Sequence, residues 1–184
     1  MDFKLTNLRC AFPHLHEAKS VNDGEPMFSL ATVIVPNSEN HKILKEGMVA
    51  VAKDKWGNKA DAILTELKSK GRVCFKESPL TKDGEPYEGF EGMFSLNASS
   101  KKRPVVVDKD KTPLTAADGK PYGGCYVDLS IEMWAQDNSW GKRINATIRW
   151  VQFRADGEAF SGGRAVSADE FAEIADGANA EALV

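Results

Sequence analysis

The 184-residue sequence is poor in cysteine and contains no C-x-x-C pair. Its three cysteines, Cys10, Cys74 and Cys125, lie far apart, which favours free thiols in a reducing compartment over a disulfide framework. No apolar run approaches the ~20 residues that cross a bilayer. The N-terminus, Met1-Asp2-Phe3-Lys4, does not have the form of a signal peptide. These absences predict a cytoplasmic protein without membrane contact.

The motifs of common enzyme classes are also absent. The sequence has no G-x-x-x-x-G-K-[ST], no G-x-G-x-x-G after a strand, no G-x-S-x-G and no H-E-x-x-H. The sequence therefore predicts a protein without catalytic residues or a cofactor. An enzyme with an unrecognised site is an alternative. Such a site would require titratable groups that converge in one cleft.

One cluster could bind a metal ion. Cys10, His14 and His16 lie within seven residues of one another. Zinc takes about four nitrogen or sulfur ligands, and the neighbouring sequence offers no fourth. We therefore interpret the cluster as a buried cysteine followed by two histidines in a turn, and predict no metal site.

The last 20 residues lack Lys and Arg altogether. Residues 165–184 carry five acids, so residues 1–164 are net +2 and the tail is net −5. We divide the chain into a folded domain, residues 1–164, and an acidic C-terminal tail, residues 165–184. A mildly basic body with an acidic tail is typical of a nucleic-acid binder that carries its own competing anion. The tail residues expected to contact partner proteins are Asp169, Glu170, Phe171, Glu173, Ile174 and Asp176.

The body has mainly β-strand patterns with one helical insertion. We expect strands at residues 2–12, ending at Pro13, and at residues 27–35, 72–77, 93–99 and 104–108. Between the second and third, Asn37 or Ser38 can cap a helix that breaks at residues 56–58, and a second helix runs over about residues 60–70.

The clearest strand runs from Tyr126 to Trp134. Its apolar residues alternate with polar and aromatic ones, a period of two that indicates a half-buried antiparallel strand. A hairpin loop at residues 137–141 leads to the returning strand at residues 144–153. Trp134 falls on the polar face, where a role in the core is less natural.

Basic residues next to aromatic residues give the strongest functional signal. Lys and Arg neutralise phosphates, and exposed aromatic rings stack on unpaired bases. A solvated loop of charges and packed core tryptophans are the structural alternatives. The candidate nucleic-acid-binding residues are Phe75, Lys76, Lys101, Lys102, Arg103, Tyr126, Trp134, Trp140, Lys142, Arg143 and Arg149.

Several segments, in their order and spacing, resemble a family of tailed-phage single-stranded DNA-binding proteins. The resemblance covers most of the chain. The segments are AFPHL (11–15), GEPMFS (24–29), ASSKKRPVVVD (98–108), GGCYV (123–127), WAQDN (134–138) and GKRI (141–144).

The resemblance implies an OB-type five-stranded antiparallel β-barrel with long loops. It implies a protein that coats single-stranded DNA (ssDNA) in phage DNA replication or recombination, in the cytoplasm of a bacterial host, with an acidic tail for replication or recombination proteins. Lys101, Lys102, Arg103, Lys142 and Arg143 match its motif positions. We expect duplex DNA or RNA to bind more weakly than ssDNA. A homodimer is one alternative for the oligomeric state. The main alternative is a phage structural or assembly protein that uses the β domain for protein contacts.

Overall fold

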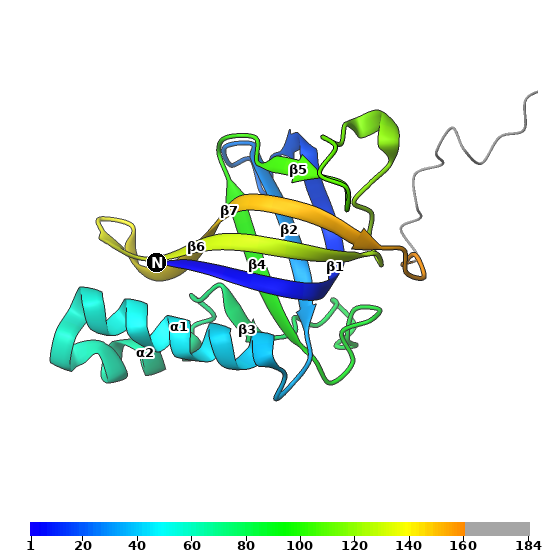
Figure 1. Cartoon of the computed structure of the whole chain (residues 1–184). Helices are drawn as coiled ribbons and strands as arrows, with labels where there is room; N and C mark the ends of the chain where they lie inside the picture. Colours follow the sequence, from blue (N-terminus) through cyan, green and yellow to red (C-terminus); the bar gives the residue numbers. More distant parts are fainter. Residues whose placement is uncertain (161–184) are drawn as a thin grey trace, which may run out of the picture.

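The computed structural model describes residues 1–160, which form a closed β-barrel with two helices at one end (Figure 1). The hydrogen-bonded order of the strands is β3-β4-β2-β1-β6-β7-β5. The strands are β1 (Asp2–Lys19), β2 (Met27–Ile34), β3 (Phe75–Glu77), β4 (Phe94–Ser100), β5 (Val105–Val107), β6 (Tyr126–Asn138) and β7 (Gly141–Ala155).

Five of these strands make the barrel. β4, β2, β1, β6 and β7 are antiparallel neighbours, and a parallel pairing of β4 with β7 at Ser99 and Thr147 closes the circle. The short strands β3 and β5 extend β4 and β7 outside the circle. The fold is therefore the predicted OB-type barrel.

β1 is longer than the sequence predicts. We expected it to end at Pro13, but it continues to Lys19 and pairs with both β2 and β6. Its register with β2 shifts between Ala11 and His14, which marks a bulge. Because a bulge leaves a residue outside the hydrogen-bond ladder, Pro13 can lie inside the strand without the N–H that a ladder requires.

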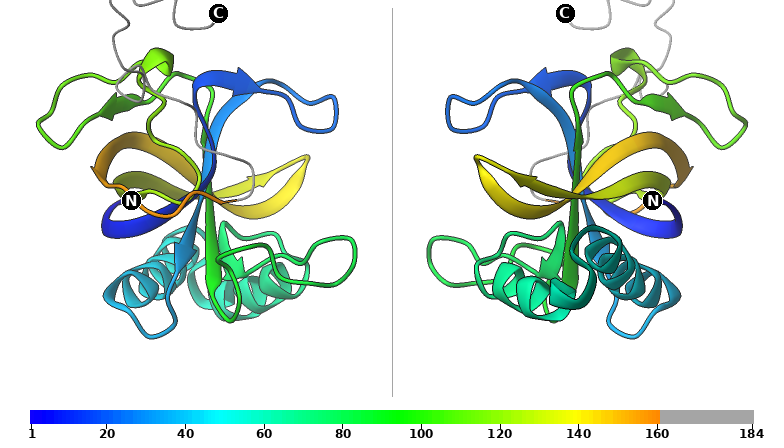
Figure 2. Two further views of the ribbon diagram at one scale, coloured as in Figure 1. Left: turned by 90° about the vertical axis from the view of Figure 1, so that its right-hand side faces the viewer. Right: turned by 90° about the vertical axis from the view of Figure 1, so that its left-hand side faces the viewer.

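Two helices cover one end of the barrel, as Figures 1 and 2 show. α1 (Glu39–Trp56) and α2 (Ala60–Ser69) lie between the second and third barrel strands, whereas a simple OB barrel has its helix after the third. Ser38 caps α1, because its hydroxyl accepts a 3.2 Å hydrogen bond from the His41 N–H. A Cβ on Gly47 would lie 2.8 Å from the Phe3 ring, so glycine allows α1 to pack closely against β1.

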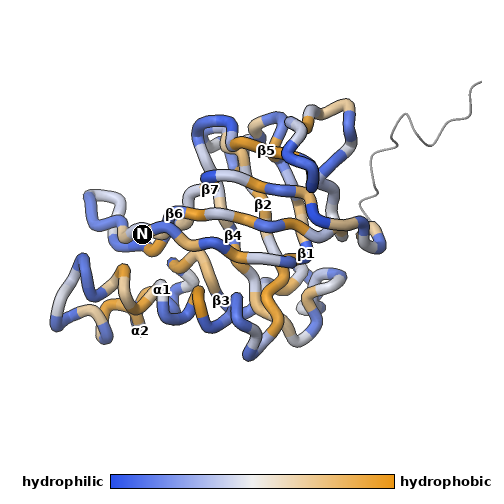
Figure 3. The backbone as a smooth tube through the Cα atoms, viewed as in Figure 1, coloured by the Kyte–Doolittle hydropathy of each residue, from blue (hydrophilic) through white to orange (hydrophobic). Residues whose placement is uncertain are grey.

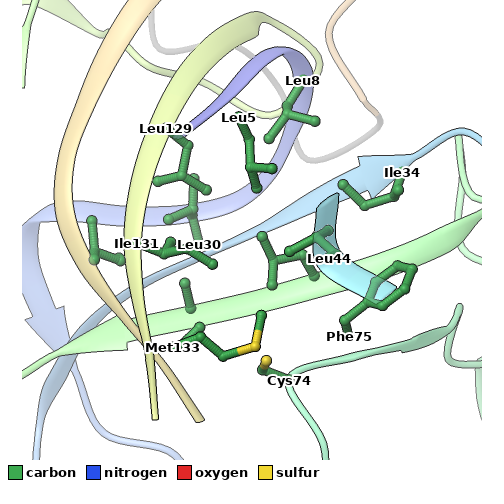
Figure 4. Close-up of a cluster of buried hydrophobic side chains, with 14 of the residues drawn as sticks. Leu5, Leu8, Leu30, Ile34, Leu44, Cys74, Phe75, Leu129, Ile131 and Met133 are labelled. Carbon is green, nitrogen blue, oxygen red and sulfur yellow. The ribbon is translucent and has the colours of Figure 1, made fainter. Parts of the chain in front are cut away.

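The core lies inside the barrel and under the helices (Figure 4). Val127, Leu129, Ile131 and Met133 are fully buried, which confirms the alternation predicted for β6. In Figure 3 apolar and polar residues alternate along the barrel strands, while the turns between them are mostly hydrophilic. In residues 1–160, no helix is both long and apolar enough to cross a membrane.

Candidate nucleic-acid interface

A groove of about 1060 Å³ crosses the outer face of β2, β4 and β7. The turn between β1 and β2 (residues 20–26) contributes Val21 to one wall, and the β6–β7 hairpin contributes Trp134 and Arg143 to another. Figure 2 shows this turn and this hairpin projecting from the same side of the barrel. The groove therefore has the position at which OB barrels bind oligonucleotides.

Six cations that the sequence selected line this groove. They come from β3, from the β4–β5 loop and from β7, three segments that are far apart in the chain. Their convergence follows from the closure of the barrel between β4 and β7. The six are Lys76, Lys101, Lys102, Arg103, Arg143 and Arg149.

Four of these six cations have no carboxylate partner within residues 1–160. Lys101 pairs with Glu25 at 2.9 Å and Arg149 with Glu132 at 3.4 Å, both among exposed side chains. Lys76 donates to the Gly71 carbonyl at 3.3 Å. The structure shows no ion pair in that range for Lys102, Arg103 or Arg143. Because these three charges need not first give up a partner, they are the ones best able to neutralise phosphates.

Trp134 gives the groove an aromatic surface. Its side chain is 39% exposed, and its indole N–H donates to the Thr147 hydroxyl at 3.0 Å. This hydrogen bond connects β6 to β7 and fixes the orientation of the ring. A fixed, exposed indole is a suitable platform for stacking by an unpaired base.

Small polar side chains lie among the apolar residues that make up the rest of the groove lining. Hydroxyl and amide groups at outward-facing positions of β2, β4, β6 and β7 can donate to phosphate oxygens and sugars. The residues selected from the sequence of these strands were cations and aromatics only. The outward alternation of β7 would have located Asn145 and Thr147. The outward-facing polar lining residues are Ser29, Asn97, Ser99, Gln136, Asn145 and Thr147, whereas Ser100 is buried and its hydroxyl donates to the Lys102 carbonyl.

Four other selected residues lie outside the groove lining. Phe75 is only 4% exposed and packs on His41 and Phe94, so its ring offers no free face. Tyr126 lies at the far end of β6, opposite Ala155. Trp140 is 82% exposed at the tip of the hairpin.

Lys142 is the fourth residue outside the groove, and it faces the helices. Its ammonium lies 3.5 Å from Asp137, which also accepts a 2.8 Å hydrogen bond from the Trp56 indole. The Trp56 hydrogen bond, together with the charge of Lys142, lowers the pKa of Asp137. The carboxylate therefore stays ionised and keeps Lys142 paired.

Cys10, His14 and His16 do not converge. Cys10 is fully buried, and its thiol donates to the Cys125 sulfur, which together with burial raises the pKa of Cys10. His14 instead lines the groove, and His16 contacts the Lys120 carbonyl at 2.7 Å. Within residues 1–160, no three side chains of the metal-binding types gather closely enough to hold an ion.

The acidic segment selected from the sequence lies outside the described residues. It comprises Asp169, Glu170, Phe171, Glu173, Ile174 and Asp176. The domain boundary placed at residue 164 is outside them as well. The last described residue, Phe160, bonds through its backbone N–H to the Gly123 carbonyl at 3.0 Å. The acidic segment therefore follows a point that is attached to the barrel.

Comparison with known proteins gives concordant matches. The profile of the family described as "Enterobacter phage Enc34, ssDNA-binding protein" matches residues 1–183. Protein p50 of Acyrthosiphon pisum secondary endosymbiont phage 1 is 39% identical over 178 residues, which cover 95% of this chain and 94% of that protein.

Solved structures of phage proteins are also similar. The ssDNA-binding protein from bacteriophage Enc34 in complex with ssDNA has a TM-score of 0.70 and 27% identity, over 87% of this chain and 89% of that one. The ssDNA-binding protein gp2.5 of bacteriophage T7 has a TM-score of 0.58 and 11% identity, over 89% and 90% of the two chains. The second likeness concerns the fold alone.

Proposed function

This chain belongs to the family of single-stranded DNA-binding proteins described for Enterobacter phage Enc34, and we propose that it binds ssDNA in the groove without sequence preference. The observation that carries the proposal is the convergence of unpaired cations and an exposed, fixed tryptophan in one groove. Phosphate neutralisation and base stacking are both tolerant of sequence, because every nucleotide has a phosphate and a π-face.

The geometry also supports a preference for single strands. Stacking on Trp134 requires a base that has left its duplex, and no residue of α1 or α2 lines the groove to read the major groove of a duplex. Duplex DNA and RNA can still contact the cations, but without the stacking contribution. We therefore expect them to bind more weakly.

In the phage cycle, the protein coats ssDNA exposed during replication or recombination. The acidic tail, residues 165–184, competes weakly for the cations of the groove and becomes available to a replication or recombination partner once DNA is bound. The tail's five acids without any cation support this role. Its tethering beside a basic surface gives it an effective concentration on the order of millimolar.

Fluorescence anisotropy with a labelled oligonucleotide across a salt series tests the proposal. Three to five phosphate contacts give a slope of about −2 to −3.5 for log affinity against log salt on single strands. Replacing Lys101, Lys102 and Arg103 together by Ala should make the slope shallower by roughly two units. The matched control replaces Lys42, Lys45 and Lys53, which are exposed on α1 outside the groove.

The control triple variant should bind like the wild type, and neither triple variant should melt much earlier, because exposed charges contribute little to stability. Absence of binding at low salt would overturn the proposal, as would an affinity that does not depend on salt. Either result would favour the reading as a structural or assembly protein, in which the barrel serves protein contacts.

A further inference from the structure

A second cavity, of about 650 Å³, adjoins the groove. Phe12 and His14 line both, so the two cavities meet at the bulge of β1. The other walls come from the loop between β3 and β4, from residues 116–123 and from Phe160. None of these walls is used in the proposed binding of DNA to the groove.

Phe12 is held in an exposed position at a backbone cost. Leu8 and Cys10 point into the barrel, and simple alternation along β1 would place Phe12 there too. Instead its φ is +48°, the register shifts beside it, and the side chain is 54% exposed. A bulky residue with positive φ is strained, and such strain concentrates at sites that hold ligands.

Tyr87 completes an aromatic pair with Phe12. The two rings meet edge to face, with centroids 5.5 Å apart and planes at 81°. Tyr87 is 36% exposed and lines only the second cavity. Because the rings are perpendicular, a flat ligand that stacks on one meets the edge of the other.

The charges around the second cavity favour an anion. Lys19 and Lys120 line it, while Glu88 is the single carboxylate that residues 1–160 contribute to its lining. Lys120 is held with its ammonium 4.8 Å from the centre of the Phe153 ring. The buried Nδ1 of His16 lacks a hydrogen-bond partner within residues 1–160. Aromatic rings beside cations repeat the chemistry of the main groove.

We propose that the second cavity continues the DNA path: a single strand that leaves the groove passes Phe12 and stacks a further base against Tyr87, with its phosphates near Lys19 and Lys120. This inference rests on the proposed binding of ssDNA in the groove. It makes the β1 bulge the point at which the strand turns from one cavity into the next, and it extends the binding site beyond the face of β2, β4 and β7.

The test compares Tyr87→Ala with the wild-type full-length chain on two oligothymidylates. Lengths of about 5 and about 15 nucleotides lie near the lower and upper ends of the range of site sizes for one OB barrel. The variant should lose about 5- to 150-fold in affinity for the longer strand, the loss expected for one stacked base. Its affinity for the shorter strand should not change, because that strand is held by the main groove.

Leu80→Ala is the matched control, since Leu80 is exposed in the same loop and lines neither cavity. It should bind both strands like the wild type. Lys19→Gln provides a second variant that does not disturb the aromatic pair, and it should weaken binding of the longer strand only.

Three results would overturn the inference. Tyr87→Ala could bind both strands like the wild type, or lose equally on both. It could also bind the longer strand more tightly, which would indicate that the cavity holds the chain's own acidic tail. Failure of the wild type to bind either strand would instead refute the proposed binding of ssDNA in the groove. The experiment therefore separates failure of this inference from failure of the proposed function.

Discussion

The two ends of the β6–β7 hairpin carry the same residue types but use them differently. At the barrel end, one guanidinium nitrogen of Arg154 donates to both carboxylate oxygens of Asp128, at 2.9 and 3.0 Å, and the Lys4 ammonium lies 5.6 Å from the centre of the Trp150 ring. At the turn end, Arg143 has no carboxylate partner within residues 1–160, and the Trp134 ring is exposed. The comparison teaches that a basic and aromatic strand becomes a binding surface only where its charges are unpaired and its rings uncovered.

The largest test of this contrast is Trp134→Ala against Trp150→Ala. Loss of one stacking platform should cost about 1 to 3 kcal/mol of binding free energy, or roughly 5- to 150-fold in affinity. Trp150→Ala should leave binding per folded molecule unchanged, even if melting shifts. Oligonucleotide titration and thermal melting measure the two effects. If Trp134→Ala unfolds the protein while binding per folded molecule persists, Trp134 is a core residue.

The charges give a smaller difference. Arg143→Ala should make the salt slope of ssDNA binding shallower by about 0.7, the value of one phosphate contact on a single strand. Arg154→Ala should leave the slope unchanged, because its guanidinium is committed to Asp128. A salt series on both variants measures this. Equal salt slopes for the two variants would show that an ion pair with a carboxylate does not decide which arginines contact DNA.

Removal of the acidic tail should sharpen the contrast further. Deleting residues 165–184 should tighten ssDNA binding at low salt by about fivefold at most, since exposed ion pairs contribute about 0.2 to 1 kcal/mol. The gain should vanish at high salt, where screening removes the attraction. This gain in affinity on tail deletion should be smaller in the Arg143→Ala background but not in the Arg154→Ala background. Identical affinity of full-length and truncated protein at low salt would remove the competition mechanism.

The smallest effect is expected at the tip of the hairpin. Trp140 lies outside the groove lining, so Trp140→Ala should change affinity by less than about twofold, as most surface substitutions do. Saturating oligonucleotide should quench tryptophan emission, and Trp134→Ala should remove more of that quench than Trp140→Ala. The reverse order would place the strand across the hairpin tip.

Local patterns predicted most of the elements. The alternation of β6, the break between the helices and the cap of α1 are short-range signals, and the structure has all three. The strand end predicted at Pro13 is wrong, because proline ends a strand only when its missing N–H belongs to the ladder. The bulge that relieves this requirement depends on tertiary pairing.

The site was only partly predictable for a similar reason. Residue type identified Lys102, Arg103 and Arg143, but type alone could not separate them from Lys142, whose partner Asp137 is positioned by the Trp56 hydrogen bond. Phe75 looked like Trp134 in the sequence, and burial alone distinguishes them. Phe12 was not identified from the sequence as a site residue, because its exposure depends on a backbone φ angle that no local sequence pattern reveals.

The closure of the barrel has a mechanical consequence. The parallel pairing of Ser99 with Thr147 is a narrow seam between β4 and β7, and it lies in the floor of the groove. A strand of DNA bound to the β4–β5 loop on one side and to Arg143 and Arg149 on the other would hold β4 and β7 together across this seam. Amide hydrogens along the seam should then exchange more slowly when DNA is bound, and the protein should melt later as DNA concentration rises.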